Sequence, residues 1–113
     1  MGYRSEIIAG VPAKDKKKAL EIIKDWDEYA LEDNMFFMQA HYWKWYDSYS
    51  EVEKFEEFIL ENEDRFLMVV GEDGALIRDM GNSWKNGVEF VARIDHGINF
   101  KENEKRKGWI IKW

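Results

Sequence analysis

The residues of this chain that could bind another molecule gather in one aromatic segment, MFFMQAHYWKWY at 35–46. The segment has the composition of a β-strand, in which successive side chains point to opposite faces of a sheet. The set predicted to face the helices is Phe36, Met38, Ala40 and Tyr42. The set predicted to face outward is Phe37, Gln39, His41, Trp43 and Trp45. An uncovered sheet face that carries several aromatic side chains is a candidate binding surface.

This surface could hold the bases of a nucleotide or nucleic acid, since bases stack on aromatic side chains and phosphates pair with Lys and Arg. Arg65 is a further cation that could meet a phosphate. The candidate binding residues are His41, Trp43, Lys44, Trp45, Arg78 and Arg93. The alternatives are that the tail residues Trp109, Ile111 and Trp113 cover this face, or that a second copy covers it in a homodimer.

Catalytic and metal-binding patterns are weak. The two histidines, His41 and His96, are far apart and outside any metal-ligand spacing, and the chain has no cysteine. No serine lies in a GxSxG elbow. We therefore predict no catalytic residue, no metal and no cofactor. The residues left for an enzyme hypothesis are His41, His96, Glu72 and Asp95, and Asp95-His96-Gly97 is more simply a turn.

Composition predicts one domain over residues 1–113, because 45% hydrophobic residues in 113 positions supply enough apolar surface for one core. The absence of cysteine, of a signal peptide and of a long apolar run favours the cytoplasm and no membrane contact. A net charge of −6 argues against a broad nucleic-acid-binding surface. The acidic run from Glu51 to Asp64 could instead imitate a row of phosphates toward a basic partner.

The periodicity predicts an α+β fold of order β-α-β-α-β-β-β, with a mostly antiparallel sheet of five or six strands and both helices on one face. Helices are expected over 14–32 and 50–63, the first ended by Asp33-Asn34 and the second begun by a capping box of Ser50 and Glu53. Strands are expected over 5–11, 35–46, 65–71, 75–81 and 88–94. Residues 97–113 are expected to form a charged loop and a possible last strand.

Three short stretches carry a family resemblance: the opening Met-Gly-Tyr-Arg-Ser-Glu, Lys44-Trp45-Tyr46 before an acidic helix, and the turn Val70-Gly71-Glu72-Asp73. Together they resemble small bacteriophage and prophage proteins of uncharacterised function, over roughly residues 1–94. The resemblance implies an accessory phage protein made in a bacterial cytoplasm. The Trp-rich tail after residue 97 departs from that pattern.

The function expected from these features is that of a non-enzymatic phage protein that binds and inhibits a host protein, by analogy with phage binders that neutralise host defences. The alternative is sequestration of a nucleotide signal between aromatic rings and Lys or Arg groups. A small enzyme and a virion-assembly protein are further alternatives.

Overall fold

An antiparallel sheet of six strands organises the chain, whose residues 3–90 and 94–102 are described by a computed structural model. The strands lie in the order β5-β4-β1-β3-β2-β8, and every neighbouring pair is antiparallel. Their bounds are β1 Ser5–Pro12, β2 Glu28–Glu32, β3 Met35–Trp43, β4 Phe66–Gly71, β5 Leu76–Gly81 and β8 Lys101–Glu102. The predicted α+β fold with a mostly antiparallel sheet is confirmed.

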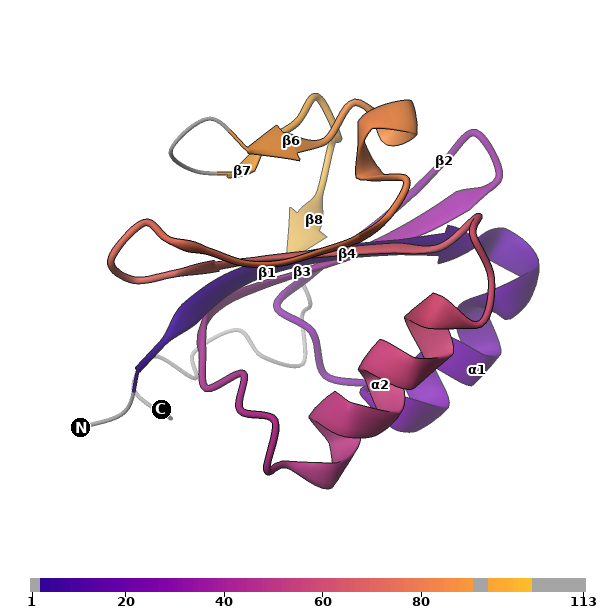
Figure 1. Ribbon diagram of the computed structural model, residues 1–113. Coiled ribbons are helices and arrows are strands. Elements are labelled where there is room, and N and C mark those ends of the chain that lie inside the picture. Colours follow the sequence, from indigo (N-terminus) through magenta and orange to yellow (C-terminus); the bar gives the residue numbers. More distant parts are fainter. Residues whose placement is uncertain (1–2, 91–93, 103–113) are drawn as a thin grey trace.

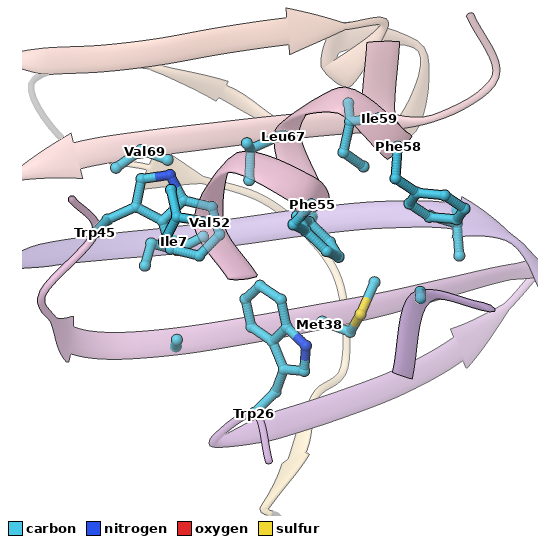
Figure 2. Close-up of a cluster of buried hydrophobic side chains, with 14 of the residues drawn as sticks. Ile7, Trp26, Met38, Trp45, Val52, Phe55, Phe58, Ile59, Leu67 and Val69 are labelled. Atoms are coloured by element: carbon cyan, nitrogen blue, oxygen red, sulfur yellow. The ribbon is translucent and has the colours of Figure 1, made fainter. Parts of the chain in front are cut away.

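Both helices, α1 (Lys16–Ile22) and α2 (Ser50–Leu60), pack on one face of this sheet (Figure 1). The main core lies between them and the sheet, where Phe55 and Ile59 of α2 meet Ile7, Met38 and Leu67 of the strands (Figure 2). These side chains are all at most 1% exposed. Alternation along the strands explains the arrangement, because every second residue of β1, β3 and β4 points to this face.

The other face of the sheet is partly covered by the segment that follows β5 (Figure 1). This segment contains a short 3-10 helix, Ser83–Asn86, and a small hairpin of β6 (Glu89–Phe90) and β7 (Ile94–Asp95). It contributes Val88, Ile98 and Phe100 to a second cluster that includes Phe37 and Met68. The tail residues expected to provide this cover, 109–113, lie outside the described residues.

The helix predicted over 14–32 is much shorter than expected. A 3-10 turn, Ala13–Asp15, leads into α1, which ends at Ile22, and Glu28–Glu32 is strand β2. The reason is the Asp33-Asn34 turn, in which both residues have positive φ (50° and 63°). Two such residues form the hairpin turn that matches strand twist, so the turn pairs β2 with β3 instead of merely ending a helix.

Two smaller predictions also need correction. Ser50 does not cap α2, since Tyr49 is the N-cap residue and no side chain caps that end. The strand predicted over 88–94 is two short strands, β6 and β7, that pair with each other. Strand β8 pairs with β2, and the run at 109–113 that is predicted to form a last strand lies outside the described residues. The strands predicted over 65–71 and 75–81 are confirmed as β4 and β5, which pair as an antiparallel hairpin.

A buried ion pair ties the start of α1 to the end of α2. The Arg65 guanidinium donates to Asp15 Oδ2 from Nε (3.3 Å) and Nη2 (3.2 Å) and to the Phe58 carbonyl from Nη1 (2.6 Å). It also lies 3.8 Å from the centre of the Phe58 ring. Because the Arg65 and Asp15 side chains are only 8% and 11% exposed, neither charge can turn to water without disrupting the helix layer.

Replacement of Asp15 tests this link. Asp15→Ala leaves a buried guanidinium without its main counter-charge, and we expect the free energy of unfolding to fall by about 3–5 kcal/mol. Urea denaturation measures the loss. The control Glu53→Ala, at an exposed site on α2, should change stability by about 0.5 kcal/mol or less. A loss below about 1 kcal/mol for Asp15→Ala would contradict the role of the pair.

Candidate functional site

A β-bulge near the end of β3 decides where the aromatic side chains point. Ser5 of β1 lies opposite Trp43 and Ile7 lies opposite Ala40, so two steps on β1 match three on β3. The extra residue falls at His41–Tyr42, and Tyr42 has φ +60°. A positive φ at a non-glycine residue costs about 1–3 kcal/mol, so the surrounding structure must hold it in place.

Two carboxylates hold the backbone of this bulge, and we call the arrangement the bulge clamp. The His41 N–H donates to Asp27 Oδ2 (2.7 Å), and the Tyr42 N–H donates to Glu6 Oε2 (3.0 Å). Arg4 Nη1 donates to the Tyr42 carbonyl (3.3 Å). Hydrogen bonds to charged groups are stronger than neutral ones, so these contacts offset the strain at Tyr42.

The bulge reverses the predicted facing of the residues beyond it. Trp43 and Trp45 were expected on the outer face, yet they lie on the helix side and are only 9% and 7% exposed. Tyr42 was expected to face the helices and is 63% exposed. The predicted alternation is correct for Phe36 through His41 and fails at the inserted residue, because one extra residue shifts the side-chain period by one position.

The two indoles are fixed by separate contacts. The Trp43 ring stacks on the Trp26 ring, with centroids 5.0 Å apart and planes 24° apart. Trp45 Nε1–H donates to Glu56 Oε2 (2.8 Å), and its ring meets the Phe55 ring edge-on. Figure 2 shows Trp26 and Trp45 near Phe55 between the sheet and α2. Such rigid aromatic side chains form a preorganised wall.

Arg78, a predicted binding residue, supports this wall. Its guanidinium donates from Nε to Glu56 Oε2 (3.2 Å) and from Nη2 to Asp47 Oδ1 (2.7 Å). Glu56 Oε2 thus accepts hydrogen bonds from both Arg78 and the Trp45 indole. We conclude that Arg78 braces Trp45 through Glu56.

Beside these indoles is a pocket of about 460 Å³, which we call the tryptophan pocket. It lies between the end of α1, the segment after β3 and the start of α2. Its lining residues are Ile22, Ile23, Lys24, Asp25, Trp43, Lys44, Trp45, Tyr49, Glu51 and Val52. The size and the mainly apolar lining are typical of sites for small molecules.

Two lysines, Lys24 and Lys44, add positive charge to the tryptophan pocket. The Lys44 side chain is half-buried, and the Lys24 side chain is exposed. Neither ammonium group is in an ion pair with another residue of 3–90 or 94–102. A cation that no protein carboxylate neutralises is available to an anionic ligand. Asp25 and Glu51 also line the pocket and balance the two lysines in formal charge, so only the ammonium groups themselves favour a small anionic group, on a ligand that is mainly apolar.

His41 remains on the outer face, where it bridges three strands. Its Nδ1 lies 2.6 Å from Glu6 Oε1 on β1 and its Nε2 lies 2.6 Å from Glu28 Oε1 on β2. The hydrogen bond to Glu6, opposed by desolvation and reinforced by Glu28, raises the pKa of His41 from 6.5 to about 9. The imidazole is therefore protonated at neutral pH, with both ring nitrogens engaged.

The predicted candidates thus divide among different places. Trp43, Lys44 and Trp45 line the tryptophan pocket, Arg78 stands behind it, and His41 faces the opposite side of the sheet. Arg93 lies outside the described residues. Four further residues were not predicted from the sequence: Lys24 and Tyr49 of the pocket and the clamp residues Glu6 and Asp27. No periodic pattern in the sequence links Lys24, Lys44 and Tyr49, because the pocket joins chain segments that have different local structures.

The four residues kept for an enzyme hypothesis are partly accounted for by structural contacts. His96 Nδ1 accepts the Ile98 N–H (3.1 Å), and its Nε2 lies 3.5 Å from Gln39 Nε2. Glu72 Oε1 accepts the Arg4 N–H (2.9 Å) at the β4–β5 turn. The Asp95 side chain is outside what the structure describes. The other three, His41, His96 and Glu72, are not among the residues that line the tryptophan pocket.

Within residues 3–90 and 94–102, no cluster of three or more His, Asp or Glu side chains is arranged to hold a metal ion. The helices of the same region are too short or too polar to cross a membrane. Comparison of the chain with protein-family models, curated proteins and solved structures finds no significant match.

The pKa of His41 gives a direct test of its environment. A raised pKa means that the Glu6 and Glu28 contacts contribute stability in full below pH 6.5 and lose it as the pH rises through about 9. We expect the His41 ring protons to titrate with a midpoint near 9 by NMR. In Glu6→Gln the midpoint should fall toward the ordinary value, because the largest raising contact is removed. An unshifted wild-type midpoint near 6.5 would contradict the geometry.

Proposed function

We propose that this protein is a non-enzymatic binding protein whose tryptophan pocket takes a small, planar, anionic ligand of the mononucleotide class. In the setting that the sequence resemblance implies, it is a phage accessory protein that sequesters a nucleotide signal of its bacterial host. The observation that carries the proposal is the convergence of two indoles, one phenol and two ammonium groups without ion-pair partners among the described residues on one pocket.

The chemistry of the lining supports this ligand class. Trp43, Trp45 and Tyr49 offer aromatic surface for a base, and stacking of one base on an aromatic side chain stabilises binding by about 1–3 kcal/mol. Lys24 and Lys44 offer charge for a phosphate. The pocket volume of about 460 Å³ suits a ligand of this size rather than the flat contact of a protein partner. Both indoles are buried beside a pocket and do not lie on an open sheet face. We therefore rank binding of a small ligand above binding of a host protein, which the sequence favoured.

The proposal predicts stabilisation of the purified protein by a mononucleotide. With AMP at about 100 times its Kd, binding adds about 2.7 kcal/mol, which raises the melting temperature by several degrees. Adenosine and inorganic phosphate, each lacking one part of the ligand, should raise it less. A scan with AMP, GMP, CMP and UMP in differential scanning fluorimetry measures the effect. No shift with any of the four would contradict the proposal.

Lysine variants locate the ligand. Lys44→Gln removes one pocket charge and keeps the apolar stem, so we expect the AMP Kd to rise about tenfold, as for the loss of one charge-assisted hydrogen bond. The matched control is Lys54→Gln, an exposed lysine on α2 outside the pocket. Isothermal titration calorimetry compares the two. Equal Kd values for both variants would place the ligand elsewhere.

A second candidate function, inhibition of a host protein, is supported by the exposed side of α2. Glu53, Glu57 and Glu61 recur at every fourth residue on that side, and Leu60 beside them is 67% exposed. This arrangement fits a basic partner with a small apolar contact. The acidic surface and the tryptophan pocket are separate sites, so each hypothesis can be tested without the other.

Charge reversal distinguishes this second function. With the protein as bait in extract of infected cells, Glu57→Lys should reduce capture of a partner that the wild type retains, and added salt should do the same. The control Glu102→Lys reverses an exposed charge on β8, outside the acidic side of α2. Equal capture by both variants would remove the α2 surface from consideration.

A further inference from the structure

The bulge clamp lies on the outer face of the sheet, yet the residue that it places lies in the tryptophan pocket on the inner face. Both backbone N–H groups of the bulge are held by carboxylates, the first by Asp27 (2.7 Å) and the second by Glu6 (3.0 Å). Trp43 follows directly in the chain. The direction of its indole therefore depends on the backbone conformation that these carboxylates hold.

Glu6 has a second role in the same place, because its two oxygens serve different partners. Oε2 accepts the Tyr42 N–H, and Oε1 lies 2.6 Å from His41 Nδ1. The far side of the His41 ring faces Glu28 Oε1, also at 2.6 Å. An imidazolium donates to both carboxylates, whereas a neutral imidazole has one N–H and can donate to only one of them.

We propose that Glu6 is a positioning residue for the tryptophan pocket, and that the protonation state of His41 on the outer face is coupled through Glu6 to the orientation of Trp43 and to ligand binding. The coupling to ligand binding rests on the proposed function. The positioning of Trp43 by Glu6 does not. Loss of the proton from His41 Nδ1 leaves Glu6 Oε1 facing a nitrogen lone pair, which weakens the hold of Glu6 on Tyr42 and releases the strained bulge.

Other charged and polar groups also lie around His41. Asp27 stands ahead of β2, Glu28 lies on β2, and Gln39 brings His96 of the segment after β7 to the same face. Arg4 is the described cation that contacts the bulge, at the Tyr42 carbonyl. Among the described residues, these contacts bring three carboxylates (Glu6, Asp27 and Glu28) and one fixed cation to the bulge, and the His41 proton offsets part of their negative charge.

The indoles report the positioning step without any ligand. Near-ultraviolet circular dichroism follows the ordered Trp26–Trp43 stack, and in the wild type we expect its signal to fall as the pH rises with the same midpoint as the His41 ring in NMR. Glu28→Gln should keep the signal at neutral pH, because Glu6 still holds Tyr42. Glu6→Ala should reduce the signal at neutral pH while far-ultraviolet dichroism stays unchanged.

A rescue variant separates positioning from general loss of stability. Tyr42→Gly relieves the positive φ, and glycine is the residue that such bulges prefer. The double variant Glu6→Ala, Tyr42→Gly should therefore recover the indole signal that Glu6→Ala loses. This comparison also decides the case in which Glu6→Ala alone fails to fold. A double variant with no recovery, or a Glu6→Ala protein with the wild-type signal, would overturn the inference.

AMP titration tests the coupling to binding. Across the titration of His41 the wild-type Kd for AMP should rise about fivefold or more, and the double variant should show a smaller rise. Equal pH dependence in the two proteins would overturn the coupling. A different result is an indole signal that follows His41 in a wild-type protein that binds no mononucleotide. This result would support the positioning role of Glu6 and contradict the proposed function.

Discussion

The bulge at His41–Tyr42 is the constraint on which the rest of the molecule depends. It inserts one residue into the strand next to the centre of the sheet and turns Trp43 and Trp45 from the outer face to the helix layer. Regular pairing would turn Trp43 to the outer face and leave the space between α1 and α2 without this part of its wall. The strained φ of Tyr42 is held by Glu6 and Asp27, so a small polar cluster on one face determines the apolar site on the other.

Preorganisation connects this geometry to the proposed function. Trp43 is stacked on Trp26, and Trp45 is held by Glu56, which Arg78 braces from behind. Side chains held in this way lose little conformational entropy when a ligand binds, so the stacking energy appears in the affinity. The lysines at the tryptophan pocket supply the polar part of recognition. The packed aromatic side chains and the lysines of the pocket together favour a ligand with a planar body and one anionic group.

Sequence periodicity predicted the sheet, α2 and the facing of Phe36 through His41, because these depend on local alternation. The prediction failed where one residue changed the outcome. A helix was predicted over 14–32, but the Asp33-Asn34 turn imposed a hairpin on its second half. The bulge was not predictable, because Tyr42 is not a glycine and its conformation is held by distant carboxylates. The tryptophan pocket combines three chain segments. Neither strand alternation nor helical periodicity therefore predicted it.

The most direct measurement is an NMR titration of the indole N–H signals with AMP. The central claim is that the bulge places Trp43 and Trp45 in a ligand site. It predicts that these two signals move together as AMP is added and saturate at one Kd, while backbone signals of the exposed residues on β5 stay in place. The claim is contradicted if the indole signals of Trp43 and Trp45 do not move, or if the responding residues lie on the outer face around His41.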